Sequence, residues 1–389
     1  MRNNERLAAI AAALVLVIGM GLGRFAFTGL YPLMVADGQI SLDGGSFAAS
    51  ANYAGYLVGA LLAALLSGIP SRRICSFAMV ATVVSLGLLA LPMPEWLIVL
   101  IRGISGAASA IAMVAASRWL IHDRRQHHAS PALFSGVGLG ILLSAELIAA
   151  GHAGSFTSFA IWLGVGVASL ILAVLAIALQ ASVDESKITR QTRDDNANKA
   201  VLFGALQLIT VYGLAGFGYI ITATYLPLLV RDAITSVDPV HIWAVFGVGA
   251  IPSCFLWHAL HNRWGTHQSL LANLLVQAVG VVLPIMHVPA AYLVSALLVG
   301  GTFMGTVTIA MPAAKSVAHQ VRFNMLAILT ASYGVGQIIG PLIASYLFGL
   351  TQSFDASLAV AGAVLAISAL LCLPGSRQQS SPSVEQRMS

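Results

Sequence analysis

Residues 21–35 read GLGRFAFTGLYPLMV, and residues 216–230 read GFGYIITATYLPLLV. Each stretch begins with a Gly-x-Gly pair and ends in Pro-Leu-x-Val, which places Pro32 and Pro227 at matching positions. The two stretches lie 195 positions apart, half the length of the 389-residue chain. A match at this offset predicts a duplicated architecture, in which two similar halves follow one another along the chain.

The composition indicates that lipid surrounds both halves. The chain is 58% hydrophobic and only 8% charged, and its mean hydropathy is +0.88. A soluble domain carries about 25% charged residues, which cover its surface. The net charge of +5 does not indicate a nucleic-acid partner, because no basic stripe with interleaved aromatic residues occurs.

Apolar runs between turn and charge signals predict an all-α membrane protein with twelve transmembrane helices, since one helix needs about 20 apolar residues to span a bilayer. The first run resembles a signal peptide, but more membrane protein follows it, so we expect an uncleaved first span. The predicted spans are residues 7–34, 46–68, 74–92, 96–120, 131–151, 156–180, 200–230, 240–260, 268–287, 290–314, 323–349 and 356–374.

Lysine and arginine predict the orientation, because cytoplasmic loops carry an excess of both. All but three of the 19 basic residues fall in segments that lie on one side of the predicted membrane. The exceptions are Arg24 and Arg102, which are inside spans, and Arg231, which is on the other side. We therefore expect both termini in the cytoplasm and the protein in a bacterial inner membrane.

One long polar connection divides the chain near its middle. Segment 182–199 holds eight charged residues of both signs and has no apolar period, which is typical of a solvated linker. We expect a six-helix bundle at 1–181, a second at 200–375, and a disordered Gln- and Ser-rich tail at 376–389.

Two six-helix halves joined by a cytoplasmic linker resemble the major facilitator superfamily, and three short motifs extend the resemblance. They are Arg102-Gly-Ile-Ser-Gly106, which is similar to an RxxxG pattern; Gly336-Gln-Ile-Ile-Gly340-Pro341, similar to a GxxxGP element; and Asn262-Arg263-Trp264-Gly265, similar to a DRxG loop whose Asp is replaced by Asn. The resemblance implies a fold of two pseudo-symmetric bundles around a central substrate cavity, with access alternating between the two sides. The missing acid removes one partner of the loop latch.

The first span resembles one branch of that superfamily more closely. Gly21-x-Gly23-Arg24-Phe25-x-Phe27-Thr28, followed by Pro32, is similar to the YbfB/YjiJ-type transporters. This resemblance implies transport and names no substrate.

Three charged residues fall inside predicted spans of the first half, at similar depth: Arg24, Arg102 and Glu146. Each costs roughly 2.5–3.5 kcal/mol at a helix centre and needs a reason. We expect both arginines to line the cavity and bind a carboxylate or phosphate-like group. Glu146 would neutralise them in the empty cavity and accept a proton during the cycle. The alternative is a static ion pair that joins three helices.

The second half has neutral polar side chains where the first has charges. At the offset of 195, Tyr219 is opposite Arg24, and Leu297 is opposite Arg102. The second wall of the predicted cavity consists of Tyr212, Tyr219, Thr222, Tyr333 and Gln337. We assign a structural or gating role, chiefly close helix packing, to Gly21, Gly23, Pro32, Gly106, Pro227, Arg263, Gly265, Gly336, Gly340 and Pro341.

The pattern predicts a monomeric secondary transporter of a small organic anion or amphipathic metabolite. We expect coupling to protons and, from the GxxxGP element, efflux rather than uptake. A membrane sensor or scaffold with the same fold is the alternative, and a membrane-embedded enzyme would need more than the single acid Glu146 at one depth. No cofactor or metal is expected, because the histidines of segment 122–128 lie in a basic loop that repels cations.

Overall fold

The computed structural model describes residues 3–183, 204–230, 238, 240–317, 320–321 and 325–373. The predicted linker beyond Val183, the tail from residue 376 and Arg231 lie outside these residues. The α-helices are α1 (Asn3–Leu16), α2 (Ala26–Ala36), α3 (Leu42–Leu65), α4 (Ser71–Leu89), α5 (Glu95–Ser117), α6 (Ser130–Ala153), α7 (Ser158–Ser182), α8 (Ala205–Val230), α9 (Val240–Val282), α10 (Pro289–Val317), α11 (Met325–Thr351) and α12 (Asp355–Leu370).

Short helices of other types join or extend these. Two are π-helices, η1 (Val17–Phe25) and η3 (Arg118–Asp123). Three are 3₁₀-helices, η2 (Leu66–Gly68), η4 (His127–Ala129) and η5 (Leu283–Met286).

The helices present apolar side chains outward, which is the arrangement that lipid requires. Within the described ranges, nine helical segments are long and apolar enough to cross a membrane. Leu65, Phe77, Ile171 and Leu206 are each more than 60% exposed on helix surfaces. A water-soluble protein would hide such residues, so the described helices form a multi-pass membrane protein.

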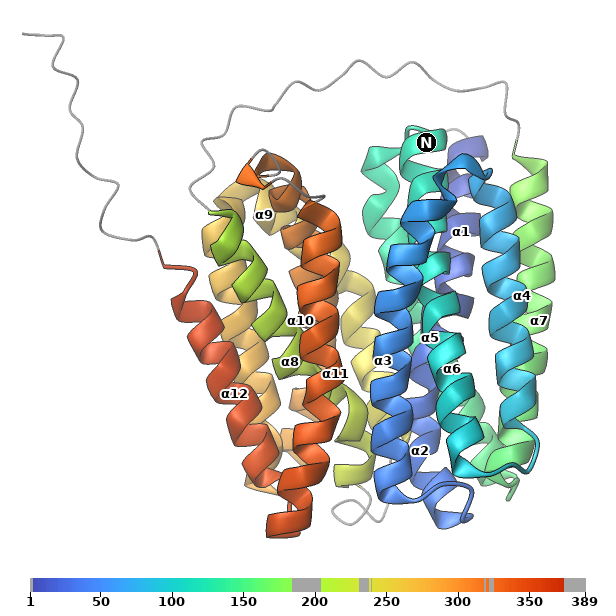
Figure 1. Ribbon diagram of the computed structural model, residues 1–389, viewed down its shortest axis with the longest axis vertical. Coiled ribbons are helices and arrows are strands. Elements are labelled where there is room, and N and C mark those ends of the chain that lie inside the picture. Colours follow the sequence, from blue (N-terminus) through green and yellow to red (C-terminus); the bar gives the residue numbers. More distant parts are fainter. Residues whose placement is uncertain are drawn as a thin grey trace, which may run out of the picture.

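The helices gather into two groups that lie side by side (Figure 1). The N-terminal group is α1–α7, and the C-terminal group is α8–α12. Two predicted spans, 240–260 and 268–287, appear as the single element α9, which is interrupted at Gly265. Gly265 has φ +77°, a backbone conformation that glycine adopts without the steric cost other residues meet.

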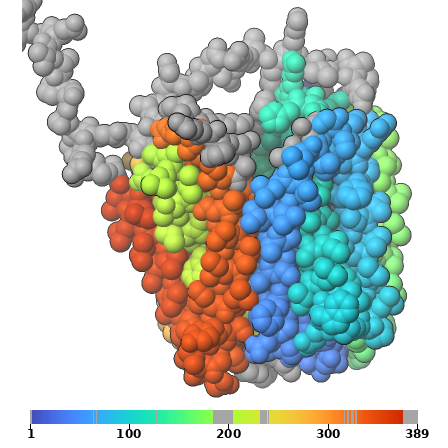
Figure 2. Space-filling model, viewed as in Figure 1, coloured from blue at the N-terminus to red at the C-terminus, as the bar shows by residue number. Residues whose placement is uncertain are grey.

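The most extensive contacts between the groups are those of α2 with α8, α3 with α11, and α6 with α9. Figure 2 shows one of these seams, where α3 and α11 meet along the face of the molecule. In terms of the predicted spans, the first contacts the seventh, the second contacts the eleventh, and the fifth contacts the eighth.

The first span is one continuous helix with a widened turn in its middle. The π-helix η1 separates α1 from α2 and contains Gly19, Gly21 and Gly23. Gly21 lies directly on the backbone of α6, since a Cβ atom there would come within 2.2 Å of Gly140 Cα. Wide turns of this type are rare and often occur at functional sites, and this one carries Arg24.

Candidate functional site

Arg24 lies at the last turn of η1, between the two helix groups. Its side chain is only 3% exposed. Nη2 donates a hydrogen bond of 2.9 Å to Gln337 Oε1 on α11. Counting 1.5 Å per residue, Arg24 is roughly 18 Å from the end of α2 at Ala36. The guanidinium therefore sits at the interface of the groups, inside the depth of a bilayer core.

Aromatic rings surround the Arg24 guanidinium. Its central carbon Cζ lies 4.2 Å from the ring centroid of Tyr56 and 4.9 Å from that of Tyr53, both on α3. The Phe25 ring lies at 5.3 Å. Ring faces attract cations, and the attraction increases when water is excluded. These contacts lower the cost of burying the charge but do not neutralise it.

No carboxylate pairs with Arg24 among the residues that the structure describes. Nη2 donates only to a neutral amide, and Nε is buried without a hydrogen-bond partner. A guanidinium carries five N–H donors in a planar fork that matches a carboxylate. Arg24 therefore has free donors and an uncompensated charge in a buried position, which is the property of an anion-binding group.

Gln337 connects Arg24 with its pseudo-symmetric counterpart. The Gln337 amide nitrogen donates to the hydroxyl of Tyr219, while its oxygen accepts from Arg24. Tyr219 stacks on Tyr333 with ring centroids 5.7 Å apart, and Tyr333 stacks on Tyr212 at 4.5 Å. Four of the predicted residues of the second half thus lie in one cluster with Arg24.

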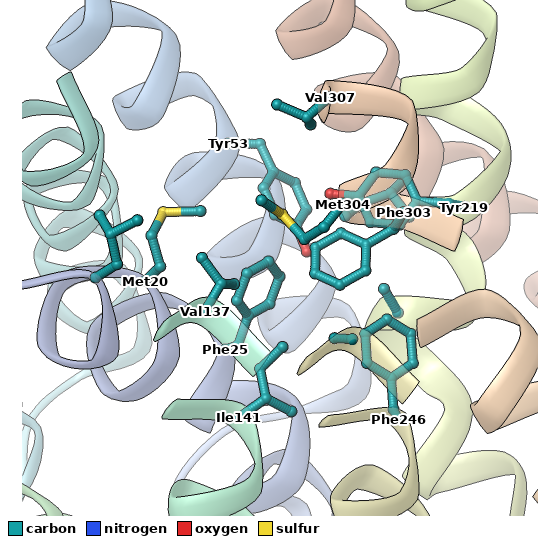
Figure 3. Packing of buried hydrophobic residues seen from close by; sticks show 14 of the residues in the cluster. Met20, Phe25, Tyr53, Val137, Ile141, Tyr219, Phe246, Phe303, Met304 and Val307 are labelled. Carbon is teal, nitrogen blue, oxygen red and sulfur yellow. The ribbon is translucent and has the colours of Figure 1, made fainter. Parts of the chain in front are cut away.

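Figure 3 shows the apolar part of this interface from nearby. Phe25 and Tyr53 from the N-terminal group lie close to Phe303 and Tyr219 from the C-terminal group. The Phe25 and Phe303 rings meet edge to face at 5.9 Å, and Tyr219 stacks on Phe303 at 5.6 Å. Aromatic side chains therefore continue from one helix group into the other.

Arg102 does not line the predicted cavity with Arg24. Its Nη1 donates to Gly23 O and its Nη2 to Arg24 O, each at 2.9 Å. Its guanidinium also lies 4.5 Å from the Phe27 ring centroid, and the residue is 2% exposed. The structure thus places the terminal nitrogens of Arg102 on backbone carbonyls, while its Nε is buried without a hydrogen-bond partner.

Arg102 contacts the widened turn of η1 through the backbone of that turn. A π-helix has a hydrogen-bond spacing that differs from that of an α-helix. Gly23 O accepts from both Arg102 and Ser105 Oγ, again at 2.9 Å. Asn52 Nδ2 in turn donates to Arg102 O. Arg102 is therefore a positioning residue that holds the turn from which Arg24 projects.

Glu146 is not the counter-ion of either arginine. Its side chain is 52% exposed, and Oε1 lies 3.3 Å from His241 Nδ1 at the start of α9. The expectation of a buried carboxylate failed because a helix has several faces, and the sequence position of Glu146 sets its depth but not the side it occupies. Glu146 instead contacts the other helix group.

A second histidine–carboxylate contact lies nearby, between the end of α6 and the segment before α9. His152 Nδ1 lies 2.5 Å from Asp238 Oδ2. Ser345 Oγ on α11 donates to Asp43 Oδ1 on α3 at 2.7 Å. These contacts join the groups at the end of the bundle opposite the N-terminus, which we call the far end.

Pro227 produces another contact between the groups. Proline has no N–H, so the carbonyl four residues earlier, Ala223 O, loses its helical donor. Thr28 Oγ1 donates to this carbonyl across the interface at 2.9 Å. Thr28 and Ala223 are 195 positions apart, the offset of the sequence repeat. A direct contact between equivalent positions is expected where two related halves meet on their symmetry axis.

Tyr225 is a further residue at the interface of the groups. Its hydroxyl donates to the carbonyl of Pro341, within the C-terminal group, at 3.1 Å. The same hydroxyl lies 2.7 Å from Ser46 Oγ on α3. Thr222 does not take part, because its buried Oγ1 has no hydrogen-bond partner. The predicted cavity wall therefore loses Thr222 as a visible contact of Arg24.

The remaining predicted glycines lie at close helix contacts. A Cβ on Gly106 would come within 1.9 Å of Asn52 O, one on Gly336 within 2.3 Å of Gly213 O, and one on Gly340 within 2.4 Å of Ile220 Cγ2. Pro32 lies inside α2, and Arg263 is exposed beside the break at Gly265. Gly106, Gly336 and Gly340 thus lie where the backbones of neighbouring helices approach closely.

Sequence reasoning missed Tyr53 and Phe303. Tyr53 is three residues before Tyr56, so the helical period places both on one face of α3, and this signal was available. Phe303 is one aromatic residue in an apolar helix and carries no signal of its own. Among the described residues, no three His, Cys, Asp or Glu side chains gather closely enough to hold a metal ion.

Comparison with known proteins agrees with this architecture. Residues 16–373 match the model of a family described as "Uncharacterised MFS-type transporter YbfB", where MFS denotes the major facilitator superfamily. The chain belongs to this family. The match covers both helix groups, so the predicted resemblance to the YbfB-type branch is confirmed. A comparison with curated proteins finds no match.

Family membership makes this chain a multi-pass membrane protein of a transporter family. Such transporters act on small molecules and are not generally enzymes.

Proposed function

We propose that this YbfB-type protein is a secondary active transporter that carries a small organic anion across the membrane. The anion binds to the Arg24 guanidinium between the two helix groups. The observation that carries this proposal is the buried, uncompensated charge of Arg24, whose only hydrogen-bond acceptor among the described residues is the amide of Gln337. A carboxylate would occupy the free donors and neutralise the charge.

Gln337 has the geometry of a placeholder in this proposal. Its oxygen accepts from Arg24, and its nitrogen donates to Tyr219. An incoming carboxylate replaces the amide oxygen as the acceptor for Arg24. Because Gln337 is on α11, this exchange changes a bond between the two groups, so binding alters the balance between their relative positions.

Alternating access follows from the far-end contacts. Thr28, Ser46 and Asp43 each hydrogen-bond to the C-terminal group, which supports a closed far end in this state. These bonds must break when the far end opens. Bonds near the opposite end must then form, so that the anion meets one side of the membrane at a time.

The protein is a monomer of twelve spans, with six in 1–181 and six in 200–375, and both termini lie on the cytoplasmic side of a bacterial inner membrane. The far end then faces outward. Efflux remains a prediction, because the close helix packing at Gly336 and Gly340 does not indicate the direction of transport.

Protons drive the cycle in this proposal, and the far-end histidine pairs are the support for it. Two pairs are concerned, His241–Glu146 and His152–Asp238. Within each pair, the carboxylate attracts the histidine strongly only when the histidine is protonated. Histidine side chains change charge between about pH 5 and 8. Protons that arrive from outside would stabilise the closed far end, and their loss would release it.

Reconstitution into liposomes tests the proposal. Uptake of a panel of radiolabelled organic acids is measured with and without a pH gradient, for the unchanged protein and for Arg24→Gln. Charge-assisted hydrogen bonds contribute about 1.5–3 kcal/mol each, so Arg24→Gln should reduce anion transport about tenfold to 100-fold. Gln277→Ala, which truncates a buried amide in α9 outside this cluster, is the control for a generally damaged protein. Anion transport that is unchanged in Arg24→Gln would overturn the proposal.

A further inference from the structure

Four aromatic rings form a nearly parallel row that leads toward Arg24. Tyr212 stacks on Tyr333 at 4.5 Å and 28°, Tyr333 on Tyr219 at 5.7 Å and 22°, and Tyr219 on Phe303 at 5.6 Å and 17°. The rings come from α8, α10 and α11. Each residue is less than 10% exposed. Three successive interplanar angles below 30° define a layered arrangement, in contrast to the mixed tilts of an ordinary apolar core.

The N-terminal group presents ring faces on the other side of the guanidinium. Tyr56 and Tyr53 lie with their centroids 4.2 and 4.9 Å from Arg24 Cζ. Arg24 thus has aromatic rings of α3 beside it and the row of the C-terminal group across the interface, reached through Gln337 (Figure 3 shows Tyr53, Tyr219 and Phe303). Five of the nine tyrosines in the chain belong to this arrangement.

Burial alone does not require tyrosine at these positions. Leucine or phenylalanine would fill the same space without a hydroxyl group that needs a partner in a buried site. Here the Tyr219 hydroxyl accepts from Gln337, and the Tyr53 hydroxyl lies 3.0 Å from Thr224 Oγ1. The rings therefore combine flat apolar faces with polar edges that bond across the interface, a combination that suits a planar and partly polar guest.

The charge of the site sets the charge of that guest. Arg24 is the cation whose terminal donors can reach a guest between the groups. Arg102 also has no carboxylate partner among the described residues, but its terminal nitrogens are bonded to Gly23 O and Arg24 O, so they cannot donate to the guest. A dianion such as a phosphate ester would need a second free cation, whereas a single carboxylate would be matched.

We propose that the substrate class is the aromatic monocarboxylates, with the carboxylate on Arg24 and the ring inserted beside Tyr219 and Tyr333. This inference rests on the proposed function and deepens it. Non-aromatic carboxylates would satisfy Arg24 equally well but would lack the stacking contacts. Neutral aromatic molecules would stack but leave Arg24 uncompensated.

A matched set of ligands tests the ring and the charge separately. Binding of benzoate, cyclohexanecarboxylate, benzamide and phenylphosphonate to the full-length protein in lipid nanodiscs is measured by titration calorimetry. Benzoate should bind roughly threefold to tenfold more tightly than cyclohexanecarboxylate, the range expected for one aromatic pair. Benzamide and the phosphonate dianion should bind weakest.

Two variants on α11 distinguish the loss of a stacking contact in the aromatic row from a general effect on folding. Tyr333→Leu should remove most of the preference for benzoate and keep the affinity for cyclohexanecarboxylate, which also shows that the variant is folded. Tyr346→Leu, at a position 68% exposed on the same helix, should leave both affinities unchanged.

The possible failures are distinguishable. Equal affinities for benzoate and cyclohexanecarboxylate, both lost in Arg24→Gln, would overturn the aromatic inference and leave the proposed function in place. Benzamide that binds as tightly as benzoate, or carboxylate binding that is unchanged in Arg24→Gln, would overturn the proposed function itself and the inference with it.

Discussion

Arg24 and Arg102 are both buried, both in the N-terminal helix group, and both next to an aromatic ring. Arg102 donates from its two terminal nitrogens to the backbone of η1. Arg24 donates once, to a side-chain amide on the opposite helix group. One guanidinium therefore binds within its own group, and the other reaches across to a group that must move relative to it.

The comparison shows that the partners of a buried charge, more than its depth, indicate its role. Backbone carbonyls in a fixed helix cannot be exchanged during a transport cycle, so Arg102 has a permanent structural task. A neutral amide on a separate helix can be replaced, so Arg24 is able to bind a ligand. The two arginines have similar positions in their spans, so only their contacts distinguish the structural residue from the binding residue.

The largest difference in stability is expected between the variants in which each arginine is replaced with methionine, an uncharged side chain of similar length. Arg102→Met removes the side-chain donor of Arg24 O, whereas Gly23 O keeps Ser105 Oγ as a donor. One buried acceptor that loses its donor costs about 1–3 kcal/mol, so we expect the free energy of unfolding to fall by about that amount. Arg24→Met removes an uncompensated charge, so its stability should be equal to or above that of the unchanged protein. Thermal unfolding in detergent, or urea unfolding in mixed micelles, measures the difference.

The relative order is the decisive readout in that experiment. If Arg24→Met were destabilised as much as Arg102→Met, the distinction between a structural and a binding arginine would be wrong. Both proteins are first checked for monodispersity, so that aggregation is not taken for unfolding.

A smaller effect is expected at the seam between the groups, where the chain provides a matched pair of threonines. Thr28→Val removes the donor to Ala223 O, and a typical hydrogen bond is worth about 1 kcal/mol. The ratio of closed to open far ends should fall about fivefold. Thr222→Val is the control, because the buried Thr222 hydroxyl has no partner to lose. Spin labels on the α6–α7 loop and the α11–α12 loop measure the distribution of distances between the two groups at the far end.

A shift toward longer distances in Thr28→Val alone would show that bonds between the groups control the conformational balance. Equal distributions in both variants would show that Thr28 does not hold the far end closed.

The smallest effect is expected for Glu146→Gln. The pair with His241 is about half exposed, and such pairs contribute below about 1 kcal/mol. The attraction exists only while His241 is protonated, so the variant should lose stability of the closed far end at low pH and little at high pH. Transport rates in liposomes between pH 5 and 8 should depend less steeply on pH. A proton-coupled rate that is identical in Glu146→Gln would remove this residue from the coupling.

Much of the architecture could be predicted because it depends on local and periodic features. Long apolar runs with few charges require lipid, and a glycine pair with Pro-Leu-x-Val at an offset of 195 requires a repeat. The match of residues 16–373 to a YbfB-type family agrees with a multi-pass membrane protein. Tyr219 as the counterpart of Arg24 also followed from the offset, and the two are joined through Gln337.

The roles of the charged residues could not be predicted, because a side chain's position along a helix sets its depth but not its partners. Arg102 donates to two carbonyls at the end of the π-helix η1, and the sequence contains no clear sign of that geometry. Glu146 turned to His241, 95 positions away, since α6 and α9 pack at the interface. The sequence by itself determined the lipid environment, the repeat and the scarcity of buried charge. Only the packing of the two groups decided which arginine bonds to the backbone of its own group and which reaches an exchangeable side chain of the other, because Arg24 and Gln337 are 313 positions apart.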